Sequence, residues 1–263
     1  MKKYIFVLLM TTTVGLFAIR SQTNENSINN DSSIPTINTK ESISTKEKSE
    51  EESLFEELGL VGKLKFEAFQ IALNGLENLN FNNKEIISVI DFTLPSTEKR
   101  MFVLDLKNKK VLFETIVSHG RNSGEKYAKE FSNRHGSFQS SLGFYTTENT
   151  YQGGNGYSLV LNGLEKGIND QAKPRAVVIH GADYCSTDVI KSTGRLGRSY
   201  GCPALPRQLT GPIINTIKNG TMLFIYAEDK TYLASSKIIN QSKSMIAQSD
   251  EIDNENNTHG VLN

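Results

Sequence analysis

The chain lacks tryptophan, has only two cysteines and carries no excess charge, because 29 lysine and arginine residues balance 29 aspartate and glutamate residues. A zero net charge argues against a general nucleic-acid binder, which shows a basic excess or stripe. Two cysteines in 263 residues are too few for a disulfide framework, although a single Cys185–Cys202 bridge stays open in an oxidising compartment. A hydrophobic content of 37% supports one sizeable core rather than several.

Metal-ligand spacing is also missing from the sequence. The histidines and cysteines match no compact pattern, such as two histidines four residues apart on a helix. We therefore predict no metal site.

The first fifty residues differ from the rest of the chain. A short apolar run at residues 4–18 follows a basic start, which is typical of a secretory signal. Residues 1–20 are predicted to be a signal peptide or, if uncleaved, an anchor that tethers the chain to the membrane. Residues 21–53 contain almost no large apolar side chains, so they are predicted to be a disordered spacer.

From residue 54 the pattern predicts a folded domain. Apolar residues at helical spacing predict a small helical region over residues 54–84 that packs on the domain that follows. Residues 85–230 are predicted to form a mainly β sheet or barrel with a few short helices, and residues 231–263 a polar tail. The expected strands are 86–92, 101–106, 110–117, 142–147, 157–161, 176–179 and 222–226, and the expected helices are 183–191 and 208–218.

A cysteine follows Ser199, Tyr200 and Gly201 in the second half of this domain. Gly201 lets the backbone turn tightly and leaves space above the sulfur, and the amides of Gly201 and Cys202 could point at an oxyanion. A buried cysteine that acts as a small hydrophobe is the alternative. Because Arg198, Ser199 and Tyr200 are poor core material, we predict that Cys202 is a nucleophile.

A histidine ends the β-branched run 176–179. A strand end is a rigid mount for a general base, and imidazole titrates in the range that a thiol needs. Gly181 would let substrate approach closely, although a histidine that merely caps backbone groups is the alternative. Because a Cys–His pair is the usual way to activate a thiol, we predict that Cys202 and His180 are the catalytic pair.

Other residues are predicted to line the site. Ser118-His119-Gly120 repeats the same strand-then-His-Gly shape, so His119 is a candidate substrate contact. The stretch 131–145 is polar, punctuated by glycine and interleaved with aromatics, as in loops that shape a polar groove. Within it, Asn133 and Tyr145 are candidate contacts, together with Gly181 next to the histidine.

These motifs carry a resemblance. His180-Gly181 followed by Ser199-Tyr200-Gly201-Cys202 resembles the signature of YkuD-type L,D-transpeptidases, bacterial cell-wall enzymes with a His-Gly followed by Ser/Thr-His-Gly-Cys. More closely, residues 54–227 resemble the branch known as the murein L,D-transpeptidase catalytic domain, with its GRSxGCPAL motif. The segments similar to that branch are 91–92, 118–120, 131–133, 140–143, 151–153 and 197–205.

The resemblance implies a β-sandwich or barrel of mixed sheets and a cysteine acyltransferase. Cys202, deprotonated with help from His180, would attack the diaminopimelate carbonyl of a peptidoglycan stem peptide, and the terminal D-Ala would leave. An amine of a second stem would then give a 3–3 cross-link, or water would give L,D-carboxypeptidase activity. The chemistry needs no cofactor, carbapenems would acylate the cysteine, and the enzyme would be exported to the periplasm or cell envelope.

The chain departs from the main family at two places. Tyr200 stands where that family has histidine, and residues 203–204 replace Ile/Val-Arg. Tyrosine cannot act as a base near neutral pH, so His180 must carry that role alone. Without the usual arginine, Arg198 is the candidate for holding the substrate carboxylate, followed by Arg207.

Two other functions stay open. One is a different cysteine cell-wall hydrolase, which shares the nucleophile and base and differs in the bond that it cuts. The other is a catalytically silent envelope-binding protein on the same fold, although a binding module has no need to keep both Cys202 and His180.

Overall fold

A computed structural model describes residues 48–241; the predicted signal, most of the predicted spacer and residues 242–263 lie outside the described residues. None of the helices in this part is long and apolar enough to cross a membrane. The elements, in chain order, are α1 (Glu50–Glu57), α2 (Phe66–Asn78), β1 (Asn83–Asp91), β2 (Met101–Asp105), β3 (Lys110–Thr115), β4 (Gly143–Gly153), β5 (Gly156–Gly163), β6 (Val178–Gly181), α3 (Thr187–Thr193), β7 (Ala204–Leu205), α4 (Arg207–Ile217), β8 (Thr221–Tyr226) and α5 (Lys230–Ser235).

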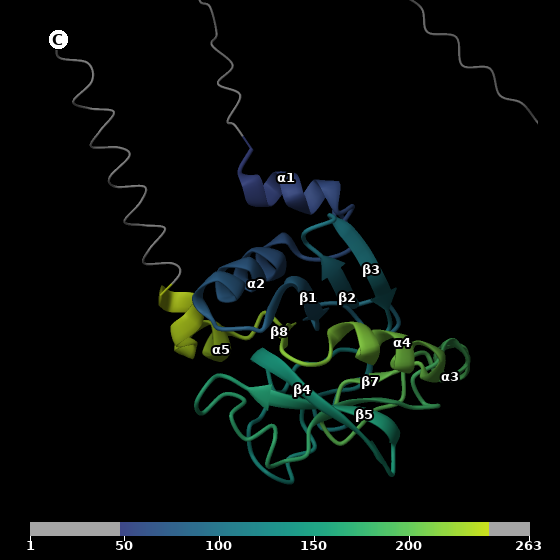
Figure 1. Cartoon of the computed structure of the whole chain (residues 1–263). Coiled ribbons are helices and arrows are strands. Elements are labelled where there is room, and N and C mark those ends of the chain that lie inside the picture. Colours follow the sequence, from purple (N-terminus) through teal and green to yellow (C-terminus); the bar gives the residue numbers. More distant parts are fainter. Residues whose placement is uncertain (1–47, 242–263) are drawn as a thin grey trace, which may run out of the picture. The chain divides into compact units, whose positions relative to one another are not determined.

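The eight strands form one mixed sheet, in the order β3-β2-β1-β8-β4-β5-β6-β7. The pairs β1–β8 and β6–β7 are parallel, and the other neighbours are antiparallel. The chain after β3 reaches the other end of the sheet, where Ser118 bridges Ala204 and Gly120 bridges Ser199. These bridges nearly close the sheet into a barrel (Figure 1), so the prediction of a mainly β, barrel-like fold is confirmed.

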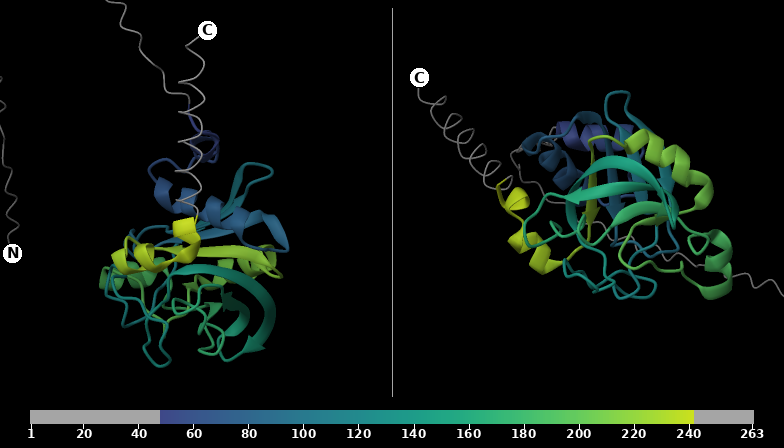
Figure 2. Two further views of the ribbon diagram at one scale, coloured as in Figure 1. Left: turned by 90° about the vertical axis from the view of Figure 1, so that its left-hand side faces the viewer. Right: turned by 60° about the horizontal axis from the view of Figure 1, so that its bottom comes forward.

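β1 and β8 are the middle of the sheet and of the core. All six residues of β8 are buried, and Ile87, Val89 and Ile90 of β1 are fully covered. α2 packs against these strands (Figure 2), and Gly75 lies so close to Phe144 that an added Cβ would come within 2.1 Å of its ring. Fully burying one large apolar side chain stabilises a fold by about 1.5–3 kcal/mol. The central strands β1 and β8 and helix α2 therefore form a tightly packed core.

Two helices precede the sheet, and the first begins inside the predicted spacer. Ser49 Oγ accepts a hydrogen bond from the Glu52 amide, and the Glu52 carboxylate accepts one from the Ser49 amide. This capping box starts α1 at Glu50. Between α1 and α2, Gly59 and Gly62 have φ angles of 65° and 74°. This left-handed backbone ends the helix and divides the apolar stripe between two helices.

The structure also places helix where the sequence predicted a polar tail from residue 231. α5 brings Tyr232 into the core, and Ile239 beyond it is buried as well. The Ser236 hydroxyl donates to the buried carboxylate of Glu165. The described chain therefore packs on the domain as far as residue 241.

Every strand expected between residues 86 and 226 is present, and both short helices are. Most strand ends lie within three residues of their predicted positions, whereas β4 continues to Gly153. The two-residue strand β7 was not predicted, and it is the strand that directly follows Cys202.

Candidate active site

His180 lies on β6, at the edge of the sheet, and Cys202 lies in a bend just before β7. β6 and β7 are parallel, with His180 opposite Ala204, two residues after the cysteine. The sulfur of Cys202 contacts the amide of Val178, two residues before His180 on β6. No hydrogen bond between the thiol and the imidazole is present among the described residues.

The loop that carries the cysteine is built by its own motif residues. Ser199 Oγ accepts from the Gly201 amide at 3.0 Å and donates to the Cys202 carbonyl at 2.6 Å. Gly201 has a φ of 123°, and an added Cβ would lie 2.8 Å from the Gln139 carbonyl oxygen. The Gly201 amide, predicted as an oxyanion donor, is therefore engaged with Ser199. The Cys202 amide faces its own sulfur and is the better-placed donor.

The thiol of Cys202 lies beside Val178, the first residue of β6. Cys202 Sγ accepts from the Val178 amide at 3.5 Å, and it donates to the Ala176 carbonyl at 3.7 Å. Burial raises the pKa of the Cys202 thiol, while the Val178 amide and the positive charge of Arg175 act in the opposite direction. The free protein therefore holds a protonated thiol, and nucleophilic attack requires a base.

His180 is oriented to supply that base. Its Nδ1 lies 3.1 Å from the Gly181 carbonyl oxygen. Because a carbonyl only accepts, Nδ1 carries the hydrogen and Nε2 keeps its lone pair. Burial, followed by the charge of Arg207, lowers the pKa of His180, so the ring is neutral at neutral pH. Gly181 is itself buried and sets the tautomer through its carbonyl, and its place in the substrate site stays a prediction.

Arg175 is a residue of this site that the sequence reasoning missed. It lies just before β6, and its charge acts on Cys202. Each terminal nitrogen also holds the loop that follows residue 131. The acceptors are the Ser132 carbonyl and Ser141 Oγ, both at 2.7 Å, for Nη1, and the Gln139 carbonyl at 2.7 Å and Ser137 Oγ at 3.3 Å for Nη2. A cation directly ahead of the strand that delivers the histidine was the available signal.

His119 is fully buried, and both of its ring nitrogens are engaged. Arg100 donates to Nδ1 at 2.8 Å, so Nε2 carries the hydrogen and donates to the Gly124 carbonyl at 3.2 Å. Burial and the charge of Arg100 lower the pKa of His119 to about 4. The ring supports the segment 118–120 that bridges the cysteine loop, and the substrate contact expected of His119 stays a prediction.

Asn133 and Tyr145 also hold the scaffold. The Asn133 side chain donates to Asp170 at 2.8 Å and accepts from the Gln171 amide at 3.0 Å. Tyr145 is fully buried, with its hydroxyl donating to the Ser141 carbonyl at 3.0 Å. The substrate contacts expected of Tyr145 and Asn133 stay predictions, and the Asn133 side chain already joins two loops.

The two arginines expected to hold a substrate carboxylate are paired within the protein. Arg198 contacts Glu125 at 2.7 Å and the Gly124 carbonyl at 3.1 Å. Arg207 binds both carboxylate oxygens of Asp183. Both guanidiniums are thus already paired with a carboxylate.

A comparison with protein families decides the assignment. The model described as L,D-transpeptidase catalytic domain, of the YkuD type, matches residues 61–226, more than half of the chain. The chain belongs to this family. No curated protein matches it.

Solved structures of L,D-transpeptidases are similar at low identity. The chain is 15% identical to an L,D-transpeptidase from Mycobacterium smegmatis, covering 54% of this chain and 59% of that one, with a TM-score of 0.35. For a mutant L,D-transpeptidase from Enterococcus faecium the values are 16%, 54%, 50% and 0.34. For the helical cell shape determining protein Pgp2 from Campylobacter jejuni they are 14%, 62%, 55% and 0.39. The chain thus spans between half and three fifths of these proteins.

Both cysteines of this L,D-transpeptidase domain are free, so the alternative of a Cys185–Cys202 bridge is wrong. Cys185 is buried in a small apolar cluster with Ile116 and Ala204, and burial raises the pKa of its thiol to about 11. It therefore lacks the exposure and the base that Cys202 has. Within residues 48–241, no three histidine, cysteine, aspartate or glutamate side chains gather as metal ligands would.

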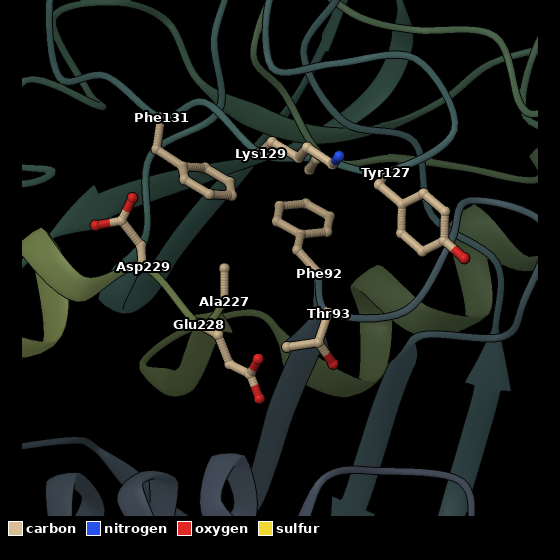
Figure 3. A pocket seen from close by; sticks show the side chains of 9 residues that line it. Phe92, Thr93, Tyr127, Lys129, Phe131, Ala227, Glu228 and Asp229 are labelled. Atoms are coloured by element: carbon tan, nitrogen blue, oxygen red, sulfur yellow. The ribbon is translucent and has the colours of Figure 1, made fainter.

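A separate cavity of about 260 Å³ lies beside the residues that directly follow β1 and β8, the two strands in the middle of the sheet. The rings of Phe92 and Phe131 face each other at its centre, between Lys129 on one side and Glu228 on the other (Figure 3). None of its lining residues belongs to the cysteine–histidine site of the transpeptidase domain.

Proposed function

We propose that the protein is a peptidoglycan-acting murein L,D-transpeptidase of the branch with the GRSxGCPAL motif, with Cys202 as nucleophile and His180 as base. The observation that carries the proposal is the hydrogen bond from His180 Nδ1 to the Gly181 carbonyl. It leaves the basic Nε2 on the strand that neighbours the cysteine, as activation of a thiol requires.

In the first half-reaction, the thiol proton passes to His180 Nε2 as the sulfur bonds to the carbonyl carbon of diaminopimelate. A rotation about the Cα–Cβ bond of Cys202 moves the sulfur from the Ala176 carbonyl toward the imidazole, and such rotations take picoseconds to nanoseconds. The Cys202 amide stabilises the oxyanion. The carbon–nitrogen bond then breaks, His180 returns its proton to the departing nitrogen, and D-Ala leaves a thioester.

In the second half-reaction, an amine of another stem peptide attacks the thioester. The new carbon–nitrogen bond forms as the carbon–sulfur bond breaks, and His180 carries the amine proton to the departing thiolate. The product is a 3–3 cross-link. Water in place of the amine gives a tripeptide, which is L,D-carboxypeptidase activity.

We propose that the enzyme is located in the cell envelope, where its peptidoglycan substrate is. Residues 1–20 act as an export signal or anchor, residues 21–53 give reach, and the domain works in the periplasm or cell envelope. Carbapenems acylate Cys202. The chemistry requires no metal or cofactor, because the thiol, the imidazole and a backbone amide supply every step.

The test is to incubate the purified full chain with a disaccharide tetrapeptide and to identify the products by mass spectrometry. We expect release of D-Ala and a cross-linked dimer. Cys202→Ala should abolish both, whereas the matched variant Cys185→Ala should leave both, because that thiol is buried away from any base.

Other outcomes select the other functions. Tripeptide without dimer would identify an L,D-carboxypeptidase, and cleavage of a different bond another cysteine cell-wall hydrolase. Binding of the tetrapeptide without any product from the wild-type chain would refute the enzyme and identify a silent envelope-binding protein.

A further inference from the structure

Three exposed side chains form a cluster beside the cysteine loop, which we call the Arg121 cluster: Arg121, Phe138 and Tyr200. The rings of Phe138 and Tyr200 are 4.9 Å apart, and they are 41% and 66% exposed. The Arg121 guanidinium lies 5.9 Å from the first ring centroid and 5.8 Å from the second. Two large aromatic rings left open to solvent under a cation form a surface prepared for a ligand.

The cluster is fixed to the backbone of the site. The Arg121 amide donates to the Ser199 carbonyl at 2.7 Å, and the Asn122 amide donates to the Phe138 carbonyl at 3.1 Å. Phe138 has a φ of 55°, a conformation that bulky residues rarely adopt. Such strain persists only where neighbouring contacts determine it, and it gathers at ligand sites.

The Arg121 cluster directly flanks Cys202. Tyr200 is two residues before the cysteine. The carbonyl of Gln139, the residue after Phe138, packs against Gly201, which lies between Tyr200 and Cys202 in the chain. The Arg121 cluster therefore adjoins the loop that carries Cys202, both in sequence and through backbone contacts.

Arg121 also differs from the other arginines around the cysteine. Arg175 is hydrogen-bonded to the loop after residue 131, Arg198 is paired with Glu125, and Arg207 with Asp183. In the part of the chain that the structure describes, the Arg121 guanidinium has ring contacts but no hydrogen bond or ion pair. Its N–H donors are therefore free for a bidentate bond to a carboxylate.

We propose that Arg121 binds the terminal carboxylate of the stem peptide, on the residue that leaves, while Phe138 and Tyr200 hold the guanidinium in place. The assignment rests on the proposed function for its substrate. Arg121 then supplies the positive charge that the missing motif arginine would have supplied, since Arg198 is paired with Glu125 and Arg207 with Asp183.

The test measures binding without turnover. In the full chain with Cys202→Ala, isothermal titration calorimetry gives the Kd of a disaccharide tetrapeptide with a free terminal carboxylate and of the same compound as a terminal amide. Arg121→Gln should weaken the acid by about ten- to a hundredfold and leave the amide nearly unchanged, because only the acid loses a charge-assisted hydrogen bond. Arg121→Lys should fall between, since it keeps the charge and loses the fork.

Lys126→Gln is the matched control, because it removes one exposed positive charge from the same loop and should change neither Kd. Equal weakening of acid and amide by Arg121→Gln, no weakening of either, or no binding of the acid by the parent would each overturn the assignment. Alanine release by the wild-type chain is scored separately. Alanine release without a difference between acid and amide would refute the role of Arg121 and keep the proposed transpeptidase activity. A difference between acid and amide without alanine release would keep the role of Arg121 and refute that activity.

Discussion

Replacing His119 tests whether this histidine supports the site from inside. Its pKa is lowered from the ordinary 6.5 to about 4, so the unfolded chain takes up the proton more readily than the folded one. Its contribution to stability is therefore complete above pH 6.5 and is lost as the pH falls toward 4. The whole gap is worth about 3 kcal/mol, most of which is lost between pH 7.5 and pH 4.5.

His119→Gln removes this dependence while keeping the contacts. A glutamine amide can still accept from Arg100 and donate to the Gly124 carbonyl. In urea unfolding of the full chain, the free energy of unfolding should fall by about 2–3 kcal/mol more in the wild type than in His119→Gln between pH 7.5 and pH 4.5. His135→Gln is the matched control: its side chain is exposed, and this variant should follow the wild type.

If the free energy of unfolding fell equally in the wild type and in His119→Gln between pH 7.5 and pH 4.5, the lowered pKa of His119 would be refuted as a source of the pH dependence. A second readout separates support from substrate contact. At pH 7.5 the variant should keep the wild-type KM for the tetrapeptide, since the buried ring offers substrate no atom. A tenfold higher KM with unchanged stability would support the substrate role that the sequence predicted.

Two further variants test the cysteine loop and its nearest cation. Gly201→Ala should cost about 1–3 kcal/mol of stability and most of the alanine release, because its φ is 123° and a new Cβ would meet a backbone carbonyl; Gly154→Ala, which meets nothing within 4 Å, should cost neither. In a Cys185→Ala background, Arg175→Met should shift the pH profile of Cys202 alkylation by iodoacetamide to higher pH, because it removes a charge that lowers the thiol pKa, whereas Arg175→Lys should shift it less. An unshifted profile in Arg175→Met would contradict this electrostatic role.

Alternating β-branched runs were sufficient to predict the strands, because each packs at least one face into the core. The three misjudged elements are stabilised by contacts that a local pattern does not contain. α1 depends on a capping box at Ser49, β7 is two residues held by β6 and the segment 118–120, and the chain after α5 is held by the buried Glu165. Their polar sequences resemble linkers because the partners that stabilise them are distant in the chain.

The candidate pair was predictable because both residues sit on short motifs of strong character, a strand end and a glycine turn. The substrate contacts were not. His119 repeats the pattern of His180, yet Arg100 folds over it and buries it, and no local pattern distinguishes the two histidines. The near-closure of the sheet brings Arg121 to the cysteine loop from 81 residues away, and the pairing of β6 with β7 brings Arg175 there from 27 residues away. Only the tertiary fold reveals that juxtaposition.

The residues of the cysteine motif differ in what they contact: some hold the loop together, and one is exposed to solvent. Arg198 ties the loop to Glu125, Ser199 bridges its backbone, and Gly201 supplies the left-handed turn; these three face inward to protein atoms. Tyr200 alone turns 66% of its surface to solvent, next to Arg121. At the position where the main family has histidine, this chain thus places a ring that holds a cation rather than one that moves a proton. In the proposed assignment, Tyr200 positions Arg121, whose guanidinium takes the place of the motif arginine.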